Sequence, residues 1–143
     1  MTAKQTQLMV LLQDLVLAFV INSAATILNG GFTETGVYLV GMFMAFCINY
    51  TAGLIIPVEK IGGGIATALG LKGFAHKLVR IFIINAIFVT IISFTIALIN
   101  CGPVPNILSI WIATYPALHL VGFVTSVLIE DSCIHLAKTL VNP

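Results

Sequence analysis

Charged side chains are scarce in this chain of 143 residues. They make up 8% of the sequence, against about 25% in an average soluble domain, whereas hydrophobic residues make up 59%. The formal net charge is only +1, so the chain lacks the basic face that binding to nucleic acid requires. The composition predicts an integral membrane protein with a single membrane domain, residues 1–143, and no soluble module.

Cysteines and catalytic motifs are also few. The three cysteines fall at predicted depths too different for them to meet within one chain, so no internal disulfide framework is expected. The glycine-rich stretch 62–72 lacks the Gly-Lys-Ser/Thr ending of a phosphate-binding loop, and neither a nucleophile elbow nor an HExxH motif occurs. The three histidines are spread along the sequence, which argues against a metal site. We expect no enzyme, no cofactor and no metal.

Long apolar runs are abundant instead. Four stretches can each cross a hydrocarbon core of about 30 Å: residues 8–28, 36–58, 78–99 and 106–129. All six basic residues then fall on one side of the membrane, namely Lys4, Lys60, Lys72, Lys77, Arg80 and Lys138. The two turns on the other side carry one charge, Glu34. Because basic residues concentrate in cytoplasmic loops, both termini are predicted to be cytoplasmic, in a multi-pass protein of the cytoplasmic membrane.

The two halves of the chain show signs of duplication. A shift of 71 residues places Asp14 on Asn85, Asn22 on Ser93, and Glu59 on Glu130. The predicted fold is therefore an all-α bundle of four transmembrane helices, built from two tandem helical hairpins that form a parallel repeat. The first repeat covers about residues 5–72 and the second about residues 76–143. The longer connection at 59–77 is predicted to hold short amphipathic pieces along the membrane surface.

The outer turns share an Asn-x-Gly pattern, at Asn29-Gly30-Gly31 and at Asn100-Cys101-Gly102. With the hairpin size and the charge at the inner ends, this pattern resembles a bacterial family of two-transmembrane-helix hairpin domains of unknown function, here present twice. The resemblance covers nearly the whole chain. It implies a fold and no activity, and it assigns no functional residues.

Polar residues form two stripes within the predicted helices. Asp14 and Asn22 share one face of the first helix, and Asn85 and Ser93 share one face of the third. One interpretation is a polar path between the two halves of the bundle. The alternative is a set of interhelical hydrogen bonds that only hold the bundle together.

Two ionisable groups are candidates for a response to protons or cations. Asp14 is the only acid within an apolar run, and His119 lies near the middle of the fourth stretch. Tyr115 and Ser126 share the face of His119 and would line the same path. The alternatives are a carboxylate near water or beside a basic residue, and a histidine that bonds a neighbouring hydroxyl or amide.

The second helix carries small residues at steps of four, which are Gly41, Ala45, Asn49 and Gly53. Such a ridge lets another helix approach closely, within the bundle or between protomers. A ligand groove with Asn49 as its polar contact is the competing interpretation.

These observations favour a transporter or channel for a small solute or ion, acting as a homo-oligomer in the lipid bilayer. The alternative is a non-transporting accessory or structural subunit, which packs against a larger membrane partner through the second helix.

Overall fold

The structure, a computed structural model, describes residues 1–28, 35–101 and 103–141. Within these ranges it has five helices: α1 (Ala3–Leu28), α2 (Thr35–Ile55), α3 (Val58–Ala68), α4 (Gly73–Cys101) and α5 (Ile107–Leu140). Four of them, α1, α2, α4 and α5, are long and apolar enough to cross a membrane, as the sequence predicted. The turn residues Asn29, Gly31, Glu34 and Gly102 lie outside the described residues, as does the side chain of Asn100.

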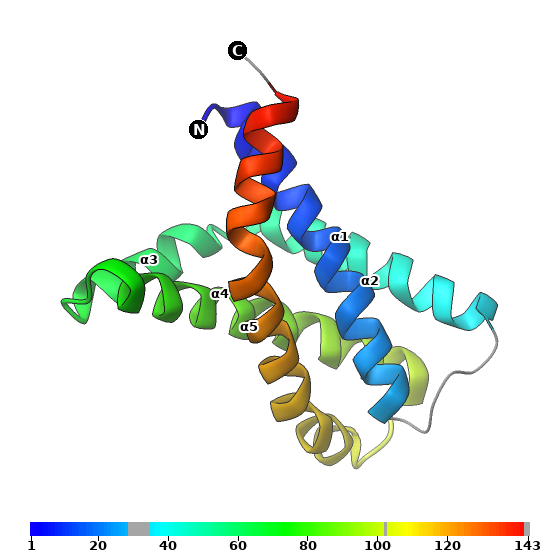
Figure 1. Cartoon of the computed structure of the whole chain (residues 1–143). Coiled ribbons are helices and arrows are strands. Elements are labelled where there is room, and N and C mark those ends of the chain that lie inside the picture. Colours follow the sequence, from blue (N-terminus) through cyan, green and yellow to red (C-terminus); the bar gives the residue numbers. More distant parts are fainter. Residues whose placement is uncertain (29–34, 102, 142–143) are drawn as a thin grey trace.

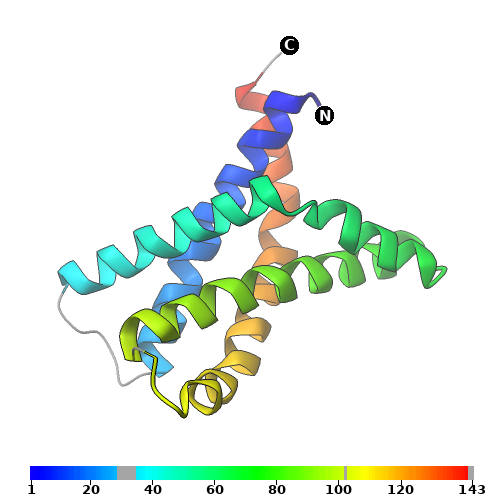
Figure 2. The same cartoon turned by 180° about the vertical axis from the view of Figure 1, so that it is seen from behind.

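The helices form two crossing layers, α1 with α5 and α2 and α3 with α4 (Figures 1 and 2). α1 packs along α5, and the two chain ends lie together at one end of the molecule. There, Gln5 Nε2 donates a hydrogen bond of 3.0 Å to the carbonyl oxygen of Val141. α2 and α3 follow one another across the first pair, and α4 runs back beside them. We call the start of α1, the end of α2, α3, the start of α4 and the end of α5 the inner ends of the helices, and the opposite ends the outer ends.

A proline and two glycines shape the connection at the inner ends. α2 stops at Ile55 because Pro57 lacks the backbone N–H that would continue the helix, and α3 starts directly after it. After α3, Gly70 and Gly73 adopt φ angles of 69° and 57°, which only glycine takes readily. The chain thereby reverses into α4, and α3 packs on α4. The sequence predicted short pieces here, and the structure has one helix of 11 residues.

α5 extends well past the predicted span of 106–129. Its 34 residues measure about 51 Å at about 1.5 Å per residue, so it is longer than a hydrocarbon core of about 30 Å. The surplus begins where the charges Glu130 and Asp131 appear. The apolar run of the sequence marks only the membrane-length part, whereas the helix itself continues because Met9 of α1 packs on Cys133 and Ala137.

The interior is unusually polar and the exterior unusually apolar. Small and branched side chains close the outer half, with Ala18, Ala45 and Ile92 in one cluster and Leu17, Ile21, Val89 and Leu118 in another. The buried polar side chains among the described residues include Gln5, Asp14, Asn22, Asn49, Asn85, Ser93 and Glu130. Large apolar side chains such as Phe43, Leu54 and Leu128 are more than half exposed. Water penalises such a surface and lipid does not, which supports a membrane environment.

Candidate functional site

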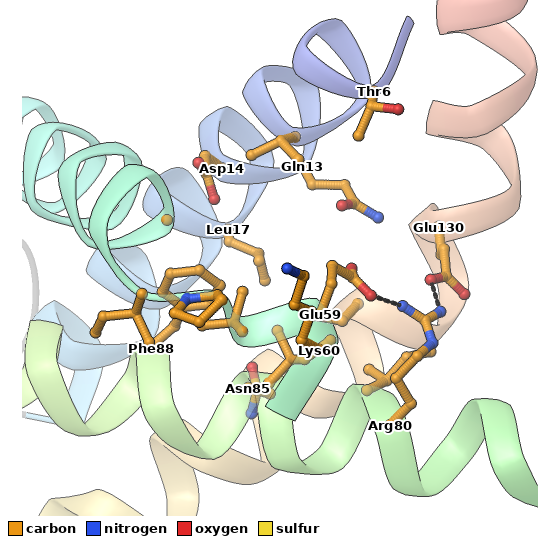
Figure 3. A pocket seen from close by; sticks show the side chains of 18 residues that line it. Thr6, Gln13, Asp14, Leu17, Glu59, Lys60, Arg80, Asn85, Phe88 and Glu130 are labelled. Carbon is orange, nitrogen blue, oxygen red and sulfur yellow. Dashed lines mark hydrogen bonds and ion pairs between the residues drawn. The ribbon is translucent and has the colours of Figure 1, made fainter. Parts of the chain in front are cut away.

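A cavity of about 320 Å³ lies among all five helices (Figure 3). Its residues come from the inner halves of the helices and end at Leu17 on α1 and Phe88 on α4. The side chains or backbone that line it belong to Thr6, Val10, Gln13, Asp14, Leu17, Gly53, Ile56, Pro57, Val58, Glu59, Lys60, Arg80, Ile81, Ile84, Asn85, Phe88, Ser126 and Glu130. The walls are thus mainly apolar, with a few polar groups at defined places, as in many small-molecule sites.

Asp14 lies at the deep end of the cavity, between α1 and α2. The residue is 3% exposed, and its Oδ1 accepts a hydrogen bond of 2.8 Å from Nδ2 of Asn49. Its Oδ2 has no hydrogen-bond partner among the described residues, and neither has Oδ1 of Asn49. A buried carboxylate with a single donor is costly, because the protein replaces only part of its hydration. Asp14 therefore lines the cavity and carries a buried, unpartnered acceptor.

Arg80 holds the mouth of the cavity together. Its Nη1 donates to Oε2 of Glu59 at 2.7 Å, and its Nη2 pairs with Oε1 of Glu130. Lys77 completes the group, at 3.3 Å from Oε2 of Glu130 and 2.8 Å from Oδ1 of Asp131. Arg80 therefore ties α3 and α5 to α4. Neither basic residue pairs with Asp14, which the sequence had left open as one alternative.

Lys60 also reaches the cavity. It follows Glu59 in the first turn of α3, and its side chain points into the cavity (Figure 3). Its ammonium forms no ion pair with a described residue. Of the charged residues that line the cavity, three are acidic and two are basic. With all of them ionised, the cavity carries one net negative charge.

His119 lies behind the cavity wall and reaches it through Asn85. Nδ2 of Asn85 donates to Nδ1 of His119 at 3.1 Å and to the backbone oxygen of His119 at 2.9 Å. Nδ1 is therefore the unprotonated ring nitrogen in this arrangement. Phe82 and Tyr115 pack on the ring with centroids 4.6 and 5.7 Å away. Gly122 makes room for Asn85, because a Cβ atom there would lie 2.6 Å from its Oδ1.

Some of the candidate residues predicted from the sequence line the cavity, and others lie outside it. Asp14, Asn85, Ser126 and Gly53 line the cavity, whereas Asn22, Ser93, Tyr115 and His119 do not. Asn22 Nδ2 donates to the backbone oxygen of Tyr38 at 3.0 Å, and Ser93 Oγ accepts 2.8 Å from Nε1 of Trp111. Tyr115 accepts 3.2 Å from Oγ1 of Thr90. These outer residues hold helices together.

The small residues of α2 face the interior of the helix bundle. A Cβ atom would lie 2.8 Å from Oδ1 of Asn22 if it were added at Gly41, and 3.5 Å from the ring of Phe88 if it were added at Gly53. Ala45 is fully buried. Asn49 binds Asp14, as described above. The ridge therefore lies against α1 and α4, and it is not available to a protein partner.

Six polar or charged residues of the cavity are not among the sequence candidates: Thr6, Gln13, Glu59, Lys60, Arg80 and Glu130. The sequence carries one signal for part of this set, since the shift of 71 residues aligns Glu59 with Glu130, and both bind Arg80. Comparison with protein-family models, with curated proteins and with solved structures gave no match. Among the described residues, no group of three side chains is arranged to hold a metal ion.

Proposed function

We propose that the chain is a transporter for a small solute or ion and that the cavity at Asp14 is its binding site. The observation that carries this proposal is Asp14, a residue that is 3% exposed, lines a cavity of about 320 Å³ and has a carboxylate oxygen without a partner among the described residues. Ionisable groups at membrane depth are expensive and commonly mark the path of a substrate or proton. A cavity of this size suits a small ligand.

A carrier is favoured over an open channel. The cavity is lined by the inner halves of the helices only, and the outer half is filled by apolar clusters that include Ile21, Val89 and Ile92. A pore would need a polar path through this region. A site that is open at one end suits a cycle in which the helices rearrange to open the other end.

The orientation and the assembly belong to the same proposal. The mouth lies at the inner ends, where the basic residues are, so the positive-inside rule makes it cytoplasmic, together with both termini. Asp14 and Asn85, which the proposed repeat aligns, both line the cavity. We further propose a homo-oligomer in the cytoplasmic membrane, with second copies on the apolar face of α2 around Val40, Phe43 and Leu54.

Flux into proteoliposomes tests the transport function. Purified protein is reconstituted, and the uptake of a panel of ions and small organic solutes is measured with and without a proton gradient. We expect uptake of at least one of them and a loss of roughly tenfold or more in Asp14→Asn, because the amide offers no charge. Glu34→Gln changes an acid that the sequence places in an outer turn, so it is the matched control and should keep the flux of the parent.

His119→Ala provides a second readout. His119 is proposed to act through Asn85, whose amide it orients at the cavity wall. We expect a smaller loss than in Asp14→Asn. Undiminished flux in Asp14→Asn would remove the site, and no flux for any solute in the parent protein would remove the transport function.

A further inference from the structure

Asp14 lines the cavity, and one oxygen of its buried carboxylate has no hydrogen-bond donor among the described residues. Oδ2 of Asp14 lacks a partner among the described residues, while Oδ1 is held by Asn49. A ligand group that carries both a positive charge and an N–H would satisfy this oxygen best, since charge-assisted hydrogen bonds are the strong ones. A quaternary ammonium has the charge but no donor, and a neutral alcohol has the donor but no charge.

The remaining walls define the rest of the ligand. Beside Asp14 they are formed by apolar side chains, among them Leu17, Ile84 and Phe88. Arg80 is already engaged by two carboxylates, so it does not offer a free charge to an anion. Glu59 and Glu130 pair with Arg80, so Asp14 is the acid of the lining without a cation bound to it among the described residues, and a monovalent cation balances it when it is ionised.

The side chain of Lys60 has the same chemistry as such a ligand and lines the same cavity. Its side chain is a four-carbon alkyl chain that ends in an ammonium, it points into the cavity, and it has no ion-pair partner among the described residues (Figure 3). Because α3 begins directly after Pro57, the stem of Lys60 is anchored at the mouth. The ammonium of Lys60 and that of a ligand would compete for one carboxylate.

We propose that the cavity binds a small lipophilic alkylammonium ion, with its N–H group on the carboxylate of Asp14 and its apolar chain on the walls, and that Lys60 is a tethered competitor for this site. This inference rests on the proposed transport function, because it names the substrate class of the same cavity.

Equilibrium binding to the purified full-length chain in detergent tests the inference separately from flux. The probes are hexylammonium, hexyltrimethylammonium, the zwitterion 6-aminohexanoate and hexanol, titrated by calorimetry. We expect hexylammonium to bind more tightly than the other three by roughly tenfold or more. Asp14→Asn should weaken hexylammonium by a similar factor, because the amide removes the charge.

The sign of the effect at Lys60 decides between ligand classes. Lys60→Met removes the competing ammonium and keeps an apolar side chain of similar length, so hexylammonium should bind several-fold more tightly. Lys72→Met, at another exposed lysine outside the cavity, is the matched control and should change nothing. Weaker binding in Lys60→Met, or tighter binding of 6-aminohexanoate than of hexylammonium, would overturn the inference in favour of a zwitterion or an anion.

The two proposals fail in different ways. Flux of some other solute that depends on Asp14, without hexylammonium binding, would overturn the substrate class and leave the transporter. Binding of hexylammonium that depends on Asp14, without flux of any solute, would leave the binding site and overturn transport. Since Lys60 is exposed, Lys60→Met keeps the test decisive even where Asp14→Asn fails to fold.

Discussion

At the residue scale, most buried polar groups bind a partner, but three side-chain atoms of the described residues do not: Oδ2 of Asp14, Oδ1 of Asn49 and Nε2 of His119. Asn85 and Ser93 each bind a partner on α5, and interhelical hydrogen bonds of this kind contribute about 0.6 kcal/mol on average. Asp14 is different, because it has only Asn49 as a donor. The sequence could identify Asp14 as unusual, since it is the only acid within an apolar run. It could not identify Asn49 as the partner, because the pairing depends on how α1 and α2 cross.

The pair of Asp14 and Asn49 predicts a stability effect. Asn49→Leu should lower the free energy of unfolding by about 1–3 kcal/mol, because the carboxylate loses its donor while it stays buried. Asp14→Leu combined with Asn49→Leu should recover part of this loss, since neither polar group is then left unpaired. Chemical denaturation in detergent measures both variants. An Asn49→Leu protein as stable as the parent would show that the hydrogen bond does not stabilise the chain.

At the element scale, glycines decide how closely the helices approach. A Cβ atom at Gly62 would lie 2.9 Å from the backbone oxygen of Arg80 and 2.9 Å from Cγ1 of Ile84. Gly62 therefore lets α3 lie on the first turns of α4, and Arg80 can then bind Glu59. The sequence could predict the four long helices, because a run of about twenty apolar residues matches the thickness of a bilayer. It could not predict that α3 packs on α4, since the stretch of glycines is compatible with many conformations.

Neighbouring glycines in α3 make a matched test of this packing. Gly62→Ala should destabilise the chain by about 1–3 kcal/mol, because the new methyl group meets backbone that cannot move aside freely. Gly63→Ala has nothing within 4 Å of its Cβ and should be neutral or stabilising by up to about 1 kcal/mol, as alanine is the better helix former. Thermal unfolding in detergent compares the two variants. Equal stability of both would place α3 away from α4.

At the scale of the whole molecule, the cavity forms where α1 and α5 cross α2, α3 and α4. Its wall combines residues that are far apart in the sequence, such as Thr6, Lys60 and Glu130. Periodicity within one helix therefore predicted the buried faces of α1 and α4 but not which residues meet across the cavity. Arg80 was interpreted from the sequence as one of several cytoplasmic charges, whereas its partners Glu59 and Glu130 are 21 and 50 residues away.

The central claim is a water-accessible cavity that enters the membrane from the side of the termini and reaches Asp14. Two positions on α1 test it, both about 15 Å or more from the start of the helix at 1.5 Å per residue. Gln13 lines the cavity, whereas Leu15 is 52% exposed on the apolar surface that would face lipid. Each is replaced by cysteine in a variant whose native cysteines Cys47, Cys101 and Cys133 are serine.

The measurement is the rate at which a membrane-impermeant maleimide labels these two variants in oriented vesicles, with a C-terminal tag to report which side is exposed. A thiol reacts as its thiolate, which forms in water and not in lipid. We predict that Gln13→Cys is labelled from the side of the tag roughly tenfold or more faster than Leu15→Cys. Equal, slow labelling of both variants, or labelling of Gln13→Cys only from the opposite side, would contradict the account.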